Sequence, residues 1–216
     1  MGCRPVGALG DGLMSGAACV PAAPPVFSVC VYCGSRPGTN PAFVRAAREV
    51  GQWIAHHQGQ LVYGGGNGGL MGEVAHATLN AGGRVVGIMP RALVEREFAN
   101  ATCTELHIVE DMHQRKAMMA NRADAFLALP GGIGTFEELF EAWTWQQLGY
   151  HDKPIGLLNV DGYYDGLLSF MANTVEQGFV GPWQMDLVTV GSDVSSLLQR
   201  LRAAGPHPWG HPGRAG

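Results

Sequence analysis

A glycine-rich turn followed by two acidic residues is the first pattern in this sequence that could do chemistry. The run Pro130–Glu138 reads PGGIGTFEE and follows a short apolar segment. Glycines let peptide N–H groups approach a ligand closely, and the amino end of a helix adds partial positive charge, so the turn is suited to a phosphate. The candidates for phosphate binding are Gly131, Gly132, Ile133, Gly134 and Thr135. The alternative is a tight turn into a capping box, in which Thr135 caps the helix and Glu138 reaches back to it.

Two adjacent cations, Arg115 and Lys116, lie just after Asp111, near the expected start of another helix. Cations at that end oppose the helix dipole, at about 0.3–1 kcal/mol each, so the pair indicates an anionic partner. The alternative is that both are solvated surface charges. Glu97 would by itself be an ordinary loop acid.

A second glycine cluster, Gly64–Gly72, reads GGGNGGLMG after another apolar segment. It satisfies the G-x-G-x-x-G spacing of dinucleotide-binding turns, but the acidic residue expected about 20 positions later is absent. A Walker-type phosphate loop also fails, because the cluster lacks Gly-Lys-Ser/Thr. Gly65, Gly66 and Asn67 therefore remain as candidate contacts of a smaller ligand.

From Val26 onward, short apolar runs alternate with longer amphipathic segments, which is typical of strands and helices in a parallel α/β sheet. The expected strands are Val26–Tyr32, Gln60–Tyr63, Arg84–Met89, Glu105–Val109, Ala125–Leu129, Ile155–Leu158 and Leu187–Val190. The expected helices are Pro41–His57, Gly69–Ala81, Asp111–Arg122, Thr135–Leu148, Tyr163–Gln177 and Ser192–Ala203. We therefore predict an α/β fold with one open, doubly wound sheet.

These elements place the unusual residues at one edge of the sheet. The two glycine clusters, Glu97 and the Arg115-Lys116 pair each follow an expected strand or open the helix after it. In a parallel sheet all such connections emerge at the carboxyl edge, where open α/β sheets bind ligands. The sequence therefore predicts a binding site at this edge.

The composition fits one globular domain. The 216 residues include 32 glycines, about twice the usual share, and are 46% apolar but only 15% charged. We expect a domain over residues 25–203, between flexible extensions at 1–24 and 204–216. Within it, Phe136, Leu139, Phe140 and Trp143 recur at helical spacing and predict a buried stripe, any exposed part of which would indicate dimerisation.

Charge and cysteine content indicate the kind of partner. The net charge is −4 and no basic run exceeds Arg115-Lys116, which argues against nucleic acid or a membrane surface. No apolar run approaches the roughly 20 residues of a membrane span. Five cysteines without paired spacing do not suggest a disulfide framework, so a cytoplasmic protein with a small-molecule partner is expected.

Taken together, these motifs resemble the LOG family of cytokinin-activating phosphoribohydrolases, formerly labelled lysine decarboxylases. The resemblance runs from about Ser28 to Gln199. It is carried by Val29–Ser35, Tyr63–Gly66, Gly69–Gly72, Met112–Lys116, Pro130–Glu138, His151–Pro154 and Asn159–Tyr164. The run Pro130–Glu138 matches the family pattern PGGxGTxxE in full.

The resemblance implies a Rossmann-like fold with a mostly parallel seven-stranded sheet, a homodimer, and no metal or other cofactor. It implies hydrolysis of the N-glycosidic bond of N6-modified adenosine 5′-monophosphates to free base and ribose 5-phosphate. The family's catalytic pair would be Arg115 and Glu138. Its substrate contacts would be Glu97, Lys116, Gly132–Thr135 and Thr144.

This chemistry agrees with the residue types. Breaking the bond to a purine builds oxocarbenium character on the ribose and negative charge on the base, and a carboxylate can stabilise the former. We therefore assign Glu138 to the sugar and water, and the permanently charged Arg115 to the developing or phosphate charge. Glu97 would orient the ribose or base, and the Gly131–Thr135 turn would hold the 5′-phosphate.

Two other functions compete with this interpretation. A pyridoxal-phosphate decarboxylase needs a Schiff-base lysine, and only Lys116 and Lys153 exist. A non-catalytic nucleotide or cofactor carrier on the same fold would keep the glycine turn without needing both Arg115 and Glu138.

Overall fold

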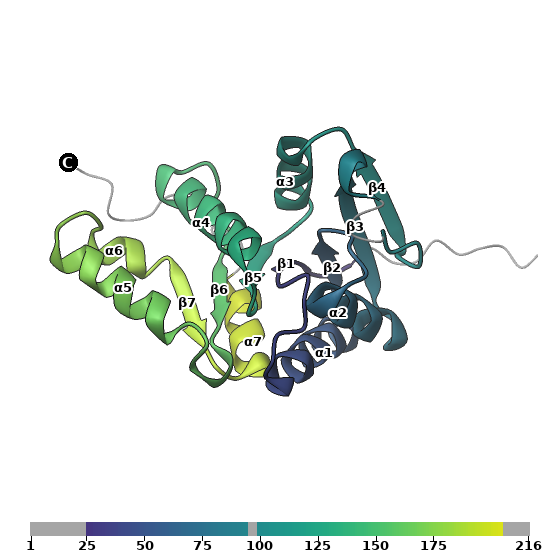
Figure 1. The fold of residues 1–216 in the computed structure, drawn as a ribbon, viewed down its shortest axis with the longest axis horizontal. Helices are drawn as coiled ribbons and strands as arrows, with labels where there is room; N and C mark the ends of the chain where they lie inside the picture. The colour runs from purple at the N-terminus through teal and green to yellow at the C-terminus, as the bar shows by residue number, and fades with distance from the viewer. Residues whose placement is uncertain (1–24, 95–98, 205–216) are drawn as a thin grey trace, which may run out of the picture.

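The computed structural model describes residues 25–94 and 99–204, which form one seven-stranded sheet between two layers of helices (Figure 1). The strands are β1 (Ser28–Tyr32), β2 (Gln60–Tyr63), β3 (Arg84–Pro90), β4 (Glu105–Val109), β5 (Ala125–Ala128), β6 (Ile155–Leu158) and β7 (Val188–Gly191). Their order is β4-β3-β2-β1-β5-β6-β7, and all six pairings are parallel. The doubly wound sheet predicted from the sequence is therefore confirmed.

Helices cover both faces of this sheet. They are α1 (Pro41–His56), α2 (Gly69–Asn80), α3 (Met112–Asn121), α4 (Ile133–Leu148), α5 (Asp165–Glu176), α6 (Pro182–Met185) and α7 (Val194–Ala204). Short 3-10 turns, η1 (Arg91–Leu93) and η2 (Val160–Gly162), follow β3 and β6. The helices α1, α2 and α7 pack on one face, and α3, α4 and α5 pack on the other.

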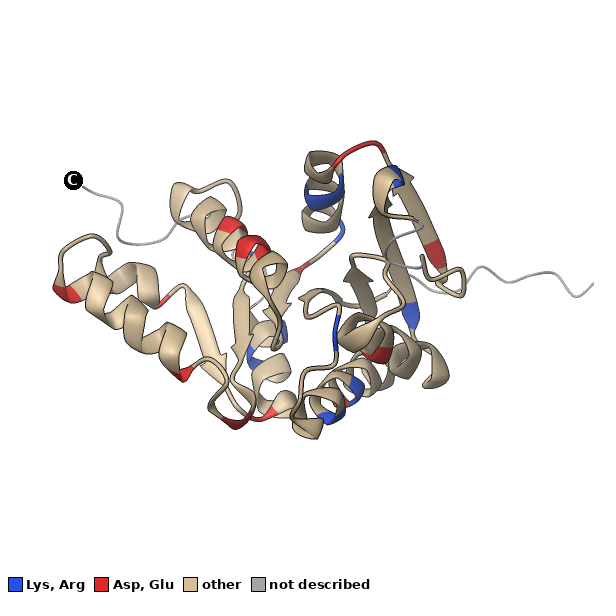
Figure 2. Ribbon diagram, viewed as in Figure 1, with Lys and Arg blue, Asp and Glu red and all other residues tan. Residues whose placement is uncertain are grey.

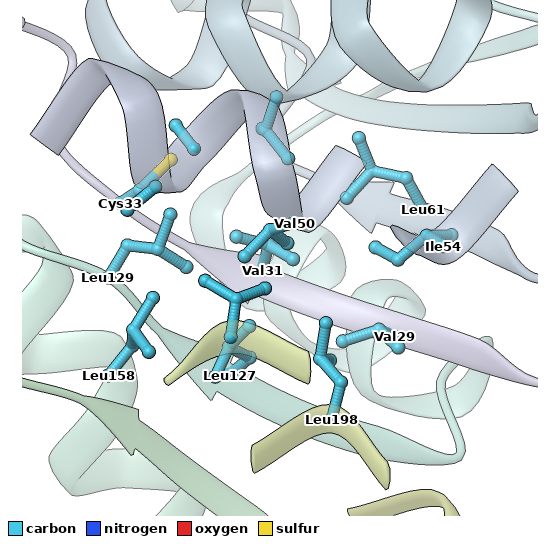
Figure 3. Packing of buried hydrophobic residues seen from close by; sticks show 14 of the residues in the cluster. Val29, Val31, Cys33, Val50, Ile54, Leu61, Leu127, Leu129, Leu158 and Leu198 are labelled. Carbon is cyan, nitrogen blue, oxygen red and sulfur yellow. The ribbon is translucent and has the colours of Figure 1, made fainter. Parts of the chain in front are cut away.

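Successive side chains along each strand point to opposite faces of the sheet, so the strands contribute to two hydrophobic cores. In β1, Val29 and Val31 point into the core under α1 and α7, whereas Cys30 and Tyr32 point into the core under α4. Figure 3 shows the first core, where Val31 lies close to Val50 of α1. Because both faces are covered, the central strands are apolar on both sides, which explains why they appear in the sequence as continuous apolar runs.

The strand order reverses at the centre of the sheet. The chain runs outward from β1 through β2 and β3 to β4, and then returns to β5 on the other side of β1. The turns that follow β1 and β5 therefore lead to helices on opposite faces. In open α/β sheets such a switch point leaves a crevice at the carboxyl edge.

Where the bounds of the helices and strands differ from those predicted from the sequence, they differ by one or two residues. The helix α6 and the two 3-10 turns were not predicted. The predicted strand at Val26 begins only at Ser28, and the predicted helix at Tyr163 begins only at Asp165. The expected extensions at 1–24 and 204–216 lie outside the described residues, apart from Ala204 at the end of α7. Within the described ranges, no helix is long and apolar enough to span a membrane.

Close packing of α1 on α2 depends on Gly51. A Cβ at this position would lie 2.5 Å from Val74 O and 2.9 Å from the Thr78 amide nitrogen. We predict that Gly51→Ala lowers the free energy of unfolding by about 1–3 kcal/mol, because the helices must move apart. Gly166→Ala in α5 is the matched control, because open space surrounds that position. Urea denaturation of both variants tests this; equal stability of the two would contradict the packing argument.

Candidate active site

The crevice at the switch point contains two adjoining cavities at the carboxyl edge of β1 and β5. The inner chamber, about 300 Å³, is lined by Arg115, Glu138, Met71 and other residues. The outer chamber, about 360 Å³, includes Phe43 and Tyr163. The chambers share the lining residues Gly34, Ser35 and Gly132. Each has the volume of a small-molecule site, and together they form one crevice.

Arg115 is the buried charge of the inner chamber. It lies on α3 with only 6% of its surface exposed. Its Nη2 donates to Gly64 O at 3.3 Å, while Nε has no hydrogen-bond partner among the described residues. A Cβ on Gly64 would lie 1.8 Å from Nη2, so only glycine leaves room for this guanidinium. A buried charge that keeps an unpaired N–H beside a cavity is suited to an anionic or electron-rich ligand.

Among the described residues, Glu138 is one of two carboxylate residues that line the same chamber, the other being Glu137. Glu138 lies in the second turn of α4, is half-buried, and lines the chamber with Arg115. Burial, followed by the negative charge of Glu138, raises the pKa of the Cys33 thiol. The same two causes raise the pKa of Cys30. Both thiols are therefore protonated at neutral pH and are poor nucleophiles.

The Gly131–Thr135 turn leads directly into α4. The helix begins at Ile133 with Gly132 as its N-cap, and no side chain caps it. The capping-box alternative is therefore wrong: Thr135 is the third residue of the helix, and its buried hydroxyl packs against Gly131. The first amide of this segment with a backbone acceptor is Phe136 N, 3.1 Å from Gly132 O. Among the described residues, the N–H groups of the preceding turn therefore have no backbone partners, as at anion-binding helix ends.

The other glycine cluster cannot play this role. Leu70 N and Met71 N, in the first turn of α2, donate to Gly34 O at 3.0 and 3.4 Å. The carbonyl of the β1–α1 turn thus occupies the amino end of α2. Gly69, with φ +55°, packs directly on the Ser35–Arg36 peptide, so this cluster serves to hold that turn in place.

Lys116 is tied to α4 by two ion pairs. Its Nζ lies 2.6 Å from Glu137 and 2.9 Å from Glu141, and 13% of the side chain is exposed. Figure 2 shows these charges, with acidic residues on α4 and basic residues on neighbouring α3. Burial lowers the pKa of Lys116, but hydrogen bonds with the two carboxylates outweigh it, so the net shift is upward. Neither Arg115 nor Lys116 is therefore a solvated surface charge, and the anionic partners of Lys116 belong to the protein.

Comparison with known proteins places this chain in a family. Residues 71–201 match the family model described as "Possible lysine decarboxylase". A cytokinin riboside 5′-monophosphate phosphoribohydrolase of Arabidopsis thaliana is 48% identical over 178 residues, covering 82% of this chain and 83% of that protein. The chain belongs to the LOG family. A probable enzyme of the same name from Oryza sativa subsp. japonica is also 48% identical, over 82% of this chain and 71% of the relative.

A solved structure shares the fold of this chain. The molybdenum cofactor carrier protein of Chlamydomonas reinhardtii superimposes with a TM-score of 0.62 over 82% of this chain and 96% of that chain. Its sequence identity is 21%, so the similarity concerns the fold alone.

The candidate substrate contacts from the second glycine cluster lie outside the two chambers. Gly65 O accepts a hydrogen bond from Asn100 N at 2.9 Å, and Gly66 forms a bridge with Ala99, so both glycines hold the 99–100 segment. Asn67 is exposed beside them. Their predicted contact with substrate stays a prediction.

The remaining expected LOG-family contacts are Thr144 and Glu97. Thr144 is exposed on α4, beyond the residues that line the chambers, and Glu97 lies outside the described residues. The β1–α1 turn contributes lining residues to both chambers but was not predicted from the sequence, although three residues of its Gly34–Gly38 run are glycine or proline. The high share of glycine and proline directly after the first strand is the sequence feature that could have indicated this turn.

The lysines do not support the older decarboxylase label. Lys116 is held by carboxylates, and Lys153 Nζ donates to Ala120 O at 2.6 Å. Neither lysine lines the chambers. Within residues 25–94 and 99–204, no three His, Cys, Asp or Glu side chains lie close enough together to hold a metal ion.

Gly64 offers a test of the Arg115 placement. We predict that Gly64→Ala displaces the guanidinium and slows any reaction that uses it by about 100-fold, the scale expected for a misplaced catalytic group. Gly166→Ala in α5, where open space surrounds the added methyl group, is the control. Nucleotide hydrolysis and a crystal structure of each variant measure the effect. Wild-type activity in Gly64→Ala would show that the reaction does not depend on Arg115 in this position.

Proposed function

We propose that this protein hydrolyses the N-glycosidic bond of N6-modified adenosine 5′-monophosphates, releasing free base and ribose 5-phosphate. The observation that carries the proposal is that buried Arg115 and the Glu138 carboxylate line one chamber beside an uncapped helix start. The names of relatives at 48% identity support the same reaction.

Glu138 acts on the sugar. As the bond from C1′ to the base breaks, positive charge builds on the ribose ring, and a nearby carboxylate stabilises it. Glu138 also takes a proton from the water whose oxygen adds to C1′. The departing base keeps the electron pair of the broken bond and gains a proton from solvent or from the carboxyl group.

Arg115 acts on negative charge. A guanidinium does not release its proton in proteins, so it serves as an electrostatic partner for the departing base or the phosphate. Its burial strengthens this interaction, because water does not screen it. Glu97 orients the ribose or base, as the LOG-family match implies. The substrate contacts that the match implies for Lys116 and Thr144 stay predictions, because neither residue lines the two chambers.

The 5′-phosphate binds at the Gly131–Thr135 turn. Gly132 and Gly134 have open space where a side chain would stand, so a ligand can approach their backbone. The amino end of α4 has no side-chain cap to compete with it. The backbone amides without acceptors in the described part of the chain and the open space beside the two glycines therefore both favour binding of a phosphate at this turn.

We further propose that the enzyme is a cytoplasmic homodimer without nucleic-acid partners. The predicted stripe of α4 is occupied by the core: Leu139 and Trp143 are buried, and Phe136 and Phe140 pack against them. The homodimer therefore rests on the resemblance to the LOG family, because Ile133, although 85% exposed, is a single apolar residue. The three cysteines in the described part of the chain carry free thiols, as suits a reducing compartment.

Glu138→Gln tests the catalytic assignment. Glutamine has the shape of glutamate but cannot accept the proton or stabilise the cationic ribose, so we expect base release to fall at least about 100-fold. Release of free base from N6-isopentenyl-AMP, followed by chromatography, measures it. Glu176→Gln, exposed on α5, is the control. Full activity of Glu138→Gln with an unchanged Tm would refute the role of Glu138. If the wild-type protein binds AMP but releases no base, a carrier function is favoured instead.

The phosphate role predicts selectivity for nucleotides. We expect kcat/KM for N6-isopentenyl-AMP to exceed that for the corresponding nucleoside by about tenfold or more, because charge-assisted hydrogen bonds are lost with the phosphate. Steady-state kinetics on the two substrates measures the ratio. Equal efficiency would remove the function assigned to the Gly131–Thr135 turn.

A further inference from the structure

The motif Asn159–Tyr164, NVDGYY, has no role in the reaction described above, yet it contacts the phosphate turn. It follows β6 and forms the 3-10 turn η2 before α5. Its two tyrosines donate hydrogen bonds to carbonyls two residues apart: Tyr164 Oη to Leu129 O at 2.6 Å, and Tyr163 Oη to Gly131 O. The motif therefore holds both ends of the segment that connects β5 to the turn.

The Tyr163 bond fixes the direction of a peptide group. The carbonyl of Gly131 and the N–H of Gly132 belong to the same planar trans peptide and point in opposite directions. Holding the carbonyl of Gly131 therefore also fixes where the Gly132 N–H points. Glycines on both sides of this peptide would otherwise let it rotate readily, since neither restricts its backbone angles.

Strained backbone brings the tyrosines into place. Asp161 has φ 49° and Gly162 has φ 72°, so two consecutive residues are left-handed. A non-glycine residue in such a conformation costs roughly 1 kcal/mol or more and persists only where its surroundings enforce it. Asn40, the N-cap of α1, donates to the Asp161 carboxylate at 2.9 Å and holds the turn.

The two tyrosines differ in what their bonds can do. Tyr164 is 1% exposed, so its hydroxyl satisfies a buried carbonyl and stabilises the fold. Tyr163 is 40% exposed and lies in the outer chamber, with its ring edge-on to Phe43 at 5.3 Å. A hydrogen bond at this wet rim adds little to stability, because water can replace it. Its effect is on the geometry of the turn.

We propose that Tyr163 is a positioning residue, whose hydroxyl holds the Gly131 carbonyl so that the Gly132 N–H faces the phosphate monoester of the substrate. This inference rests on the proposed function for the identity of the substrate. The proposal assigns the NVDGYY motif a role in phosphate selectivity. The motif follows β6 and lies outside the Gly131–Thr135 turn itself.

Tyr163→Phe tests the proposal, because it keeps the ring and its contact with Phe43 and removes only the hydroxyl. We expect KM for N6-isopentenyl-AMP to rise about fivefold to tenfold, the value of one hydrogen bond, with kcat nearly unchanged. The dissociation constant of ribose 5-phosphate, measured by calorimetry, rises by the same factor. Activity on the unphosphorylated nucleoside and the Tm stay at wild-type values. Tyr150→Phe, 76% exposed and outside the crevice, is the matched control.

Tyr164→Phe separates positioning from stability. It removes a buried hydrogen bond, so we expect a lower Tm. If Tyr163→Phe lowers the Tm in the same way without a phosphate-specific change in KM, its role is structural and the proposal is overturned. Unchanged KM and unchanged binding of ribose 5-phosphate in Tyr163→Phe also overturn it.

Binding distinguishes this inference from the proposed function. If the wild-type protein binds ribose 5-phosphate but hydrolyses no nucleotide, the proposed function fails, while weaker binding by Tyr163→Phe still supports the positioning role. If the wild-type protein hydrolyses N6-isopentenyl-AMP while ribose 5-phosphate binds the wild-type protein and Tyr163→Phe equally well, the positioning role is overturned and the proposed function stands.

Discussion

The burial of one guanidinium constrains most of this site. Arg115 is removed from water on α3, and its charge must be met by groups that the fold supplies. The carbonyl of Gly64 meets part of it, and the missing side chain of Gly64 makes the space. The end of β2, the start of α3 and the chamber beside Glu138 must therefore keep their relative positions for the charge to remain in place.

The reversal of strand order explains why the crevice lies where it does. The turns after β1 and β5 diverge to opposite faces, and Gly34 N still donates to Pro130 O across the gap at 3.1 Å. Gly34 O accepts from the first turn of α2. The β1–α1 turn is thereby pinned to both neighbouring connections. This leaves the amino end of α4 open to the crevice while that of α2 is occupied.

The charged residues around the crevice form two groups, one whose ion pairs link α3 to α4 and one whose members both line the inner chamber. Lys116 with Glu137 and Glu141 links α3 to α4, and its charges are satisfied within the protein. Arg115 and Glu138 both face the inner chamber, where a ligand can reach them. The adjacent residues Arg115 and Lys116 are thus divided by helix geometry, because neighbours on a helix point about 100° apart. Arg115 lines the inner chamber, whereas Lys116 does not and pairs with Glu137 and Glu141.

The sequence by itself determined the alternation of strands and helices, the parallel sheet and the gathering of the candidate site residues at its carboxyl edge. These follow from local patterns of apolar residues and turn residues, which depend on near neighbours in the chain. Only the tertiary structure decided which glycine cluster is open to a ligand, because Gly34 O lies far from Leu70 in sequence and caps α2 through space. The same holds for the burial of Arg115 against Gly64, the β1–α1 turn and the Tyr163 contact with Gly131. Each joins residues from separate strand-to-helix connections, and no pattern within one connection specifies its partner in another.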